Sequence, residues 1–175
     1  MSANSFGRHF RITTWGESHG PAIGVVLDGC PAGLALDLVE LQRVVSQRAP
    51  GSNALTSPRT ERDAVEVLSG LFEGQTTGAP ISLVIWNQDK DSSKYEPIKH
   101  LYRPGHANYT YLEKYGAFDY RGGGRASARE TACRVVAGAI AQQLLATQGV
   151  RIKAFMRSMG DVSCNGHWTM DALLQ

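Results

Sequence analysis

Apolar positions in the first half of the chain follow the patterns of β-strands. Residues 9–15 alternate loosely, with Phe10, Ile12 and Thr14 on one side, whereas residues 22–27 are more continuously apolar. Similar runs recur downstream, so strands are predicted over residues 9–15, 22–27, 65–72 and 80–86. The polar residues 51–62 predict an exposed loop able to serve as a mobile flap, and residues 87–99 predict an irregular segment.

Three stretches instead have the three-four spacing of apolar residues that is typical of helices. Asp37, with Glu40 three residues later, predicts the start of a helix that ends by Pro50. Asn108 predicts the start of a short aromatic helix that runs to Tyr115. The longest helix is predicted from Ser127 to Gly149, followed by a strand over 150–156 and the beginning of a helix over 170–174.

Composition and length then narrow the class of protein. The 175 residues, 42% hydrophobic and 19% charged, suit one globular domain over 1–175 with mixed α/β (α+β) architecture. No stretch suits a signal peptide or membrane span, so no membrane partner is expected. Three cysteines without paired spacing predict neither disulfides nor a metal site, and favour a cytoplasmic location. A net charge of +2 is too small to indicate a nucleic-acid partner.

The segment from Tyr120 to Arg134 has the features of an anion site. Three glycines, 122–124, allow a ligand to approach the backbone, and the helix start that follows offers free N–H donors. Ser127 and Glu130 have the spacing of a reciprocal capping box. The surrounding arginines suit phosphate or carboxylate, although a flexible loop with solvated arginines, or a surface for single-stranded nucleic acid, has the same pattern.

Two further loops each present a histidine. Residues 16–21 place Glu17, Ser18 and His19 on a tight connection between two strands, and Pro104 stiffens the turn that carries His106. Imidazole titrates near neutrality, so either histidine suits proton transfer, while a surface histidine without function remains the alternative. The neighbouring positions of Ser18 and His19 do not make them a nucleophile and base pair.

Together the segments 16–20, 103–107 and 121–131 resemble chorismate synthase, in this order and at these separations. The likeness covers essentially the whole chain but only the N-terminal half of the family's sequences. It implies a β-α-β sandwich, here incomplete, and a homotetramer at full length. Gln47, Ala54 and Ala126 depart from the family, which usually has a basic residue, an arginine and a serine at these positions.

The resemblance implies a 1,4-elimination that converts 5-enolpyruvylshikimate 3-phosphate to chorismate and phosphate. The reaction requires reduced FMN, with NADPH as a candidate reductant, and belongs to aromatic amino acid biosynthesis. Its implied catalytic residues are His19 as general acid, His106 beside the flavin, Ser18 and Ser127. Implied FMN contacts are Arg125, Ala126 and Ser127, and implied phosphate or carboxylate partners are Arg48, Arg103 and Arg129. The alternative is an inactive fragment that only binds anionic ligands or partner subunits.

Overall fold

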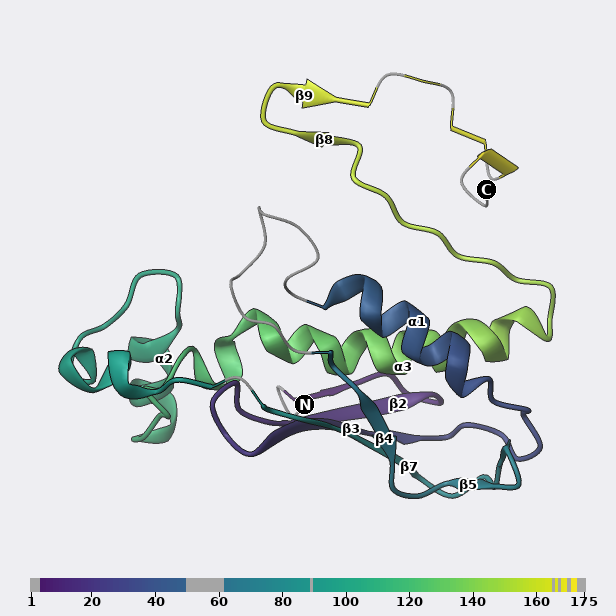
Figure 1. The fold of residues 1–175 in the computed structure, drawn as a ribbon, viewed down its shortest axis with the longest axis horizontal. Coiled ribbons are helices and arrows are strands. Elements are labelled where there is room, and N and C mark those ends of the chain that lie inside the picture. The colour runs from purple at the N-terminus through teal and green to yellow at the C-terminus, as the bar shows by residue number, and fades with distance from the viewer. Residues whose placement is uncertain are drawn as a thin grey trace.

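An antiparallel sheet with two helices on one of its faces forms the body of the protein, as a computed structural model shows (Figure 1). The structure describes residues 4–49, 62–88, 90–164, 166, 168–169 and 171–172. In spatial order the strands of the sheet are β1 (Ser5–Phe6), β2 (Arg11–Gly16), β3 (Ala22–Asp28), β7 (Ile81–Trp86) and β4 (Val65–Val67). Strands β3 and β7 lie toward the middle of this order and are the most deeply buried.

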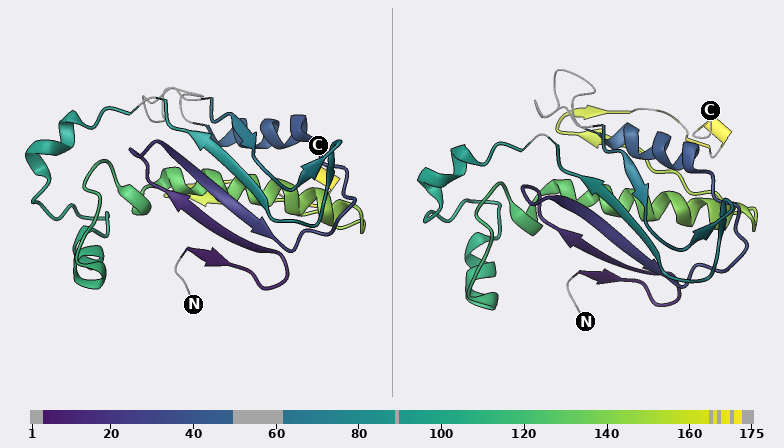
Figure 2. Two further views of the ribbon diagram at one scale, coloured as in Figure 1. Left: turned by 90° about the horizontal axis from the view of Figure 1, so that it is seen from below. Right: turned by 60° about the horizontal axis from the view of Figure 1, so that its bottom comes forward.

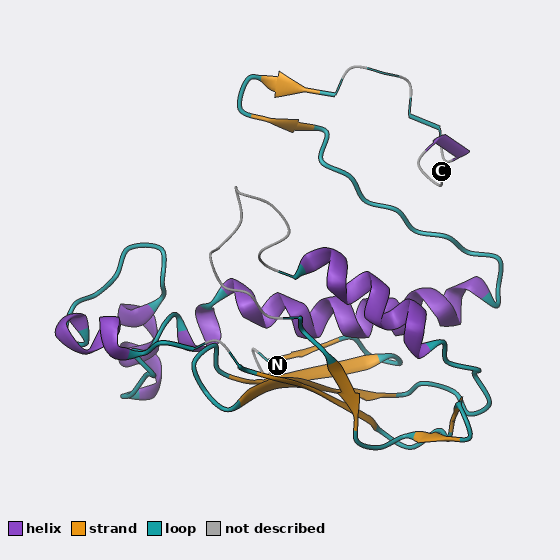
Figure 3. Cartoon of the chain, in the orientation of Figure 1, coloured by secondary structure: helices purple, strands orange, loops and turns teal. Residues whose placement is uncertain are grey.

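Two helices cover the same face of this sheet (Figures 2 and 3). Helix α1 (Leu38–Arg48) begins at Asp37, whose Oδ1 accepts hydrogen bonds from the backbone N–H groups of Val39 and Glu40, both at 2.9 Å. Helix α3 (Thr131–Ala146) packs against α1 and against β3. Between helices and sheet lies one apolar core, to which each layer contributes side chains that are at most 2% exposed, among them Ile23, Leu27, Leu41, Val45, Ile81, Leu83, Val136 and Ile140.

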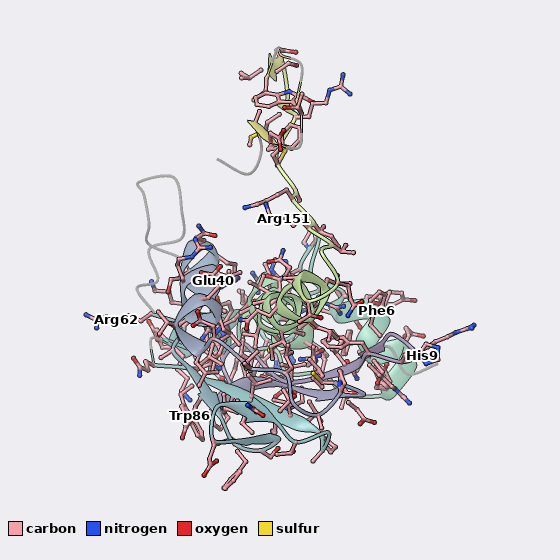
Figure 4. All side chains as sticks on the ribbon, turned by 90° about the vertical axis from the view of Figure 1, so that its right-hand side faces the viewer. Phe6, His9, Glu40, Arg62, Trp86 and Arg151 are labelled. Carbon is pink, nitrogen blue, oxygen red and sulfur yellow. The ribbon has the colours of Figure 1, made fainter. Side chains whose placement is uncertain are left out.

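Smaller elements lie around this body. At one end of the sheet are the 3₁₀ helix η1 (Ser93–Ile98) and helix α2 (Asn108–Tyr115), close to the start of α3 (Figure 1). Strands β5 (Leu71–Phe72) and β6 (Gln75–Thr76) form a separate hairpin. In the side view, Glu40 lies on the helix layer and Trp86 on the sheet, while Arg151 lies on the extended segment beyond α3 (Figure 4).

The C-terminal segment extends away from the sheet and helices (Figure 1). Strands β8 (Ser158–Met159) and β9 (Val162–Ser163) form a second hairpin there, and every described side chain from residue 150 onward is exposed. Among the described residues, no helix is both long and apolar enough to cross a membrane.

The expected mixed α/β class is confirmed, and the structure contains the predicted strands over 9–15, 22–27 and 80–86 as β2, β3 and β7. Helix α1 and its Asp37 cap are confirmed as well. The loop predicted over 51–62 lies almost wholly outside the described residues, and of the helix predicted over 170–174 only residues 171–172 are described, as helical.

Several local predictions are wrong. The strand expected over 65–72 is two strands in different sheets, because Gly70, with φ of +83°, interrupts the extended backbone between them. No strand forms over 150–156, where no described segment lies alongside to supply ladder hydrogen bonds. The irregular segment 87–99 contains η1. The helix predicted from Asn108 to Tyr115 is confirmed as α2, but Ala107 occupies its N-cap position, so Asn108 does not cap it.

The helix packing predicts opposite effects of two substitutions two residues apart in α3. Ile140→Ala removes a fully buried side chain and should lower the free energy of unfolding by about 2–5 kcal/mol. Gly138→Ala adds a methyl group at an exposed position with no atom of another element within 4 Å, and should raise it by about 0.5–1 kcal/mol. Urea unfolding of both variants measures this, and a destabilised Gly138→Ala would contradict the described surface of α3.

Candidate active site

The glycine segment 122–124 lies between the two loops that carry the histidines. A Cβ added to Gly122 would lie 2.1 Å from His19 Nδ1, and one added to Gly123 would lie 3.2 Å from His106 Cδ2. Gly122 also has a φ of +64°, a conformation that side chains other than glycine rarely adopt. Close packing against His19 therefore requires glycine at position 122, while a Cβ at position 123 would be in tight contact with His106 and with the Ser127 backbone.

Hydrogen bonds connect the glycine segment to the loop of His19. The Ser18 side chain is 2% exposed, and its Oγ lies 3.1 Å from His19 Nδ1 and accepts from the Gly123 N–H at 3.4 Å. The Ser18 N–H donates to the Gly124 carbonyl, also at 3.4 Å. Ser18 thus contacts the imidazole and the glycine segment at once, which suits a positioning role for this hydroxyl.

Arg103 connects the same glycine segment to His106. Its Nη1 donates to the Gly122 carbonyl, and its Nη2 lies 3.3 Å from His106 Nε2. The guanidinium lies 5.3 Å from the centre of the Tyr95 ring, and that ring makes an edge contact with His19 at 5.1 Å between centroids. Arg103 and Tyr95 therefore lie between the two histidines.

A cavity of about 450 Å³ opens on the His106 side of the glycine segment. Its lining includes His106, Arg125, Ala126, the acidic residues Glu17 and Asp119, and the backbone of Gly123 and Gly124. Aromatic side chains supply much of the remaining wall, namely Trp15, Tyr111, Tyr115 and Phe118. This size and this combination of apolar walls with a few polar groups are typical of small-molecule sites.

The guanidinium of Arg125 is engaged with the end of β2. Its Nη1 donates to the Gly16 carbonyl at 2.7 Å, and its Nη2 donates to Thr14 Oγ1 at 2.7 Å and to the Thr14 carbonyl at 3.2 Å. The Ala126 N–H donates to the Gly123 carbonyl at 2.8 Å. Arg125 thus fixes one wall of the cavity, adjacent to the loop that carries His19.

The start of α3 differs from the predicted capping box. Ser127 Oγ accepts from the Arg129 N–H at 3.4 Å, and a short 3₁₀ turn, η3 (Ala128–Glu130), precedes α3. The Glu130 carboxylate does not reach back to Ser127. It accepts instead from Thr14 Oγ1 at 2.7 Å and from Arg134 Nε at 3.0 Å, because the partners from β2 and from the next turn of α3 compete for it.

Burial raises the pKa of the Glu130 carboxyl, but hydrogen bonds from Thr14 and Arg134, with the charges of Arg134 and Arg125, outweigh it and hold the pKa below its usual value. Glu130 therefore stabilises the fold as a carboxylate that links α3 to β2. Its folded-state pKa lies below the unfolded one, so this contribution is present above the unfolded pKa and is lost as pH falls through the folded pKa.

Two of the predicted phosphate-binding arginines converge on a buried carboxylate, that of Asp63. Arg48 Nη1 donates to Asp63 Oδ2 at 2.9 Å and Arg129 Nη1 donates to Asp63 Oδ1 at 2.8 Å. The Arg129 side chain is 4% exposed and that of Arg48 24%, while that of Asp63 is fully buried. Among the described residues, two cations therefore share the carboxylate of Asp63.

Carboxylates also lie within electrostatic range of His19. Hydrogen bonds from Ser93 lower the pKa of Asp91, and the charge of His19 contributes to the same shift. Burial raises the pKa of Asp119, but hydrogen bonds from Arg121 outweigh it, with a smaller contribution from His19, so this pKa is also lowered. Asp91 and Asp119 therefore lie near enough to interact with a positive charge on His19.

The predicted residues fall into three neighbouring groups. His106, Arg125 and Ala126 border the cavity, Ser18 and His19 lie across the glycine segment with Arg103, and Arg48 and Arg129 meet at Asp63. Ser127 lies outside the cavity lining, next to Gly123.

Sequence reasoning missed Tyr95, Asn87 and Asp63. Asn87 carried a usable signal, a polar residue directly after a buried strand, whereas Asp63 had none.

The close packing at Gly122 predicts a selective effect on His19. Gly122→Ala and Gly116→Ala both place alanine at a positive φ, at a cost of about 1–2 kcal/mol, but nothing lies within 4 Å of the added atom at Gly116. Gly122→Ala should lose about 1–3 kcal/mol more and displace the imidazole. Unfolding curves measure the loss of stability, and the ring NMR signals of His19 measure the displacement of the imidazole. Equal results for the two variants in both measurements would refute the packing at Gly122.

Comparison with known proteins identifies the family of this chain. A model of the chorismate synthase family matches residues 10–173. Among curated proteins, chorismate synthase of Protochlamydia amoebophila is 62% identical over 162 residues, covering 93% of this chain and 44% of the relative. Chorismate synthase of Methanococcoides burtonii is 57% identical with the same coverage.

Among solved structures, a crystal structure of chorismate synthase matches with a TM-score of 0.61 and 35% identity, covering 81% of this chain and 35% of that chain. The chain thus spans less than half the length of the curated relatives given above. The family match over residues 10–173 includes the two histidine loops and the glycine segment. The chain belongs to the chorismate synthase family.

Proposed function

We propose that this chain carries the N-terminal part of a site that eliminates phosphate from 5-enolpyruvylshikimate 3-phosphate to give chorismate. The observation that carries the proposal is the convergence of His19 and His106 on one glycine segment beside a cavity. In the reaction, the C–O bond to phosphate breaks and the substrate loses a proton, so no net oxidation or reduction occurs. The protein must therefore neutralise a departing phosphate and manage a proton.

His19 is the proposed general acid toward the phosphate. An imidazolium offsets the negative charge that grows on the leaving group, and a loop position leaves the ring half-buried rather than enclosed. Ser18 Oγ, at 3.1 Å from Nδ1, would hold the ring and leave Nε2 to face the substrate. His19 and Ser18 thus act as one unit, with Ser18 as the positioning partner.

The cavity fits the reduced FMN that the family reaction requires. Its aromatic walls suit a flat ring system, and its volume of about 450 Å³ lies in the usual range for such ligands. Bound there, reduced FMN would supply an electron-rich ring without net redox change. His106 would donate or accept a hydrogen bond at its edge, and Arg125 and Ala126 would form the adjoining wall, with Ser127 behind that wall. NADPH is the proposed reductant.

Arg48, Arg103 and Arg129 are the proposed sources of positive charge for the phosphate and carboxylates of the substrate. Arg103 is the best placed for direct contact, since it lies between the two histidines. Arg48 and Arg129 would contribute positive charge from beside Asp63. In this account the site works within a cytoplasmic homotetramer, with no nucleic acid, membrane or metal involved.

A second function, binding without turnover, is favoured by one specific observation. The chain spans 44% of the length of the relative from Protochlamydia amoebophila. Its described residues from 150 onward are all exposed, with Ile152, Met156 and Val162 each more than half exposed. Such a chain would bind anionic ligand or partner subunits and leave catalysis to a larger assembly.

Phosphate release separates the two functions. The chain is incubated anaerobically with the phosphorylated substrate and reduced FMN, beside His19→Asn, His106→Ala and the exposed control His100→Ala. The proposal predicts release that falls by about 10²–10⁴-fold in the first two variants, the usual contribution of a general acid or base, and is unchanged in the control. Absence of release from folded wild-type chain that still binds the substrate would overturn the catalytic proposal in favour of binding alone.

A further inference from the structure

A single buried amide closes the loop that carries His19. Asn87 directly follows β7 and is 7% exposed. Its Nδ2 donates to the Glu17 carbonyl at 3.0 Å and to the Gly20 carbonyl at 2.9 Å, so both amide protons are used on the two residues that flank Ser18 and His19. The two ends of the loop are therefore held by one side chain from the neighbouring strand.

The other end of the same amide is fixed by a buried ion pair. Arg129 Nε donates to Asn87 Oδ1 at 2.5 Å, and Arg129 Nη1 donates to Asp63 Oδ1 at 2.8 Å. Guanidinium groups only donate hydrogen bonds, so the oxygen of the amide must face Arg129 and the NH₂ group must face the loop. The start of α3 thus determines, through Asp63 and Arg129, which way Asn87 points.

Backbone hydrogen bonds and an exposed lysine also connect this loop with the segment after β7. The Asn87 N–H donates to the Pro21 carbonyl at 3.0 Å, and within the loop the Gly20 N–H donates to the Glu17 carbonyl at 3.1 Å. Lys90 Nζ adds a contact to the Gly20 carbonyl at 3.2 Å, from a residue that is itself exposed. Asn87 is the buried side chain that ties the loop to the core of the protein.

We propose that Asn87 is a positioning residue for His19, oriented for this role by the Asp63–Arg129 ion pair. Its hydrogen bonds to Glu17 and Gly20 fix the position of this turn relative to β7. They thereby place the His19 imidazole against Gly122. This inference rests on the proposed function only for its catalytic meaning, because the position of His19 is measurable in the chain without substrate or cofactor.

The Asn87→Asp substitution tests the role with little change of volume. A carboxylate still accepts from Arg129, but its second oxygen faces the Glu17 and Gly20 carbonyls and has no proton to donate. Amide hydrogen exchange at residues 18–20 should accelerate at least tenfold relative to residues 106–108, and the ring signals of His19 should shift while those of His106 stay in place. The His19 signals are assigned by their loss in His19→Asn.

Ile140→Val is the matched control, because it weakens the buried core without touching the loop. It should leave both the exchange ratio and the His19 signals as in the unsubstituted chain. If Asn87→Asp does not fold, Asn87→Ser, which removes the amide without adding a charge, is measured in the same way. Unchanged exchange and unchanged His19 signals in the folded Asn87 variant would overturn the proposal.

Where phosphate release is measurable, the turnover rate tests the positioning role independently. A positioning role predicts a kcat about 10–100-fold lower in Asn87→Asp with a smaller change in KM. If Asn87→Asp disturbs His19 but the unsubstituted chain releases no detectable phosphate, the positioning role is supported. That result counts against the proposed function only. Failure of the positioning role of Asn87 can therefore be distinguished from failure of the proposed function.

Discussion

The arrangement of the site depends on the absence of side chains at Gly122 and Gly123. Two loops more than eighty residues apart in sequence reach the same short segment, and an added Cβ would come within 2.1 Å of His19 Nδ1 on one side and 3.2 Å of His106 Cδ2 on the other. Interiors are packed too densely to absorb such an overlap without displacing a neighbour. Close approach at glycine, rather than direct contact between the histidines, is what brings them into one site.

Buried polar groups hold the elements that make this approach. Asp63, Arg129 and Asn87 connect the start of α3 to the end of β7 and the loop of His19, while Glu130, Thr14 and Arg125 connect the same part of α3 to β2. Each network combines charge with several hydrogen bonds, as burial of ionised groups requires. The arginines that the sequence suggested as ligand-binding groups therefore also determine where the histidines lie.

The sequence predicted the regular elements whose signal is local. The apolar runs of β3 and β7 and the Asp37 cap of α1 were read correctly, because periodicity and capping depend on neighbouring residues. The predicted capping box at Ser127 was wrong, since Thr14, more than a hundred residues away, competes for Glu130. The buried partner of Arg48 and Arg129 had no local signal either, because Asp63 acquires its role only from tertiary packing.

The most direct test of this account is a nuclear Overhauser spectrum of the isotope-labelled chain in solution, without substrate or cofactor. The account predicts cross-peaks from the His19 ring to the Hα protons of Gly122 and from the His106 ring to those of Gly123, because both pairs are in packing contact. Cross-peaks at only one glycine, or at neither, in a folded chain would contradict the claim that the glycine segment unites the two histidine loops.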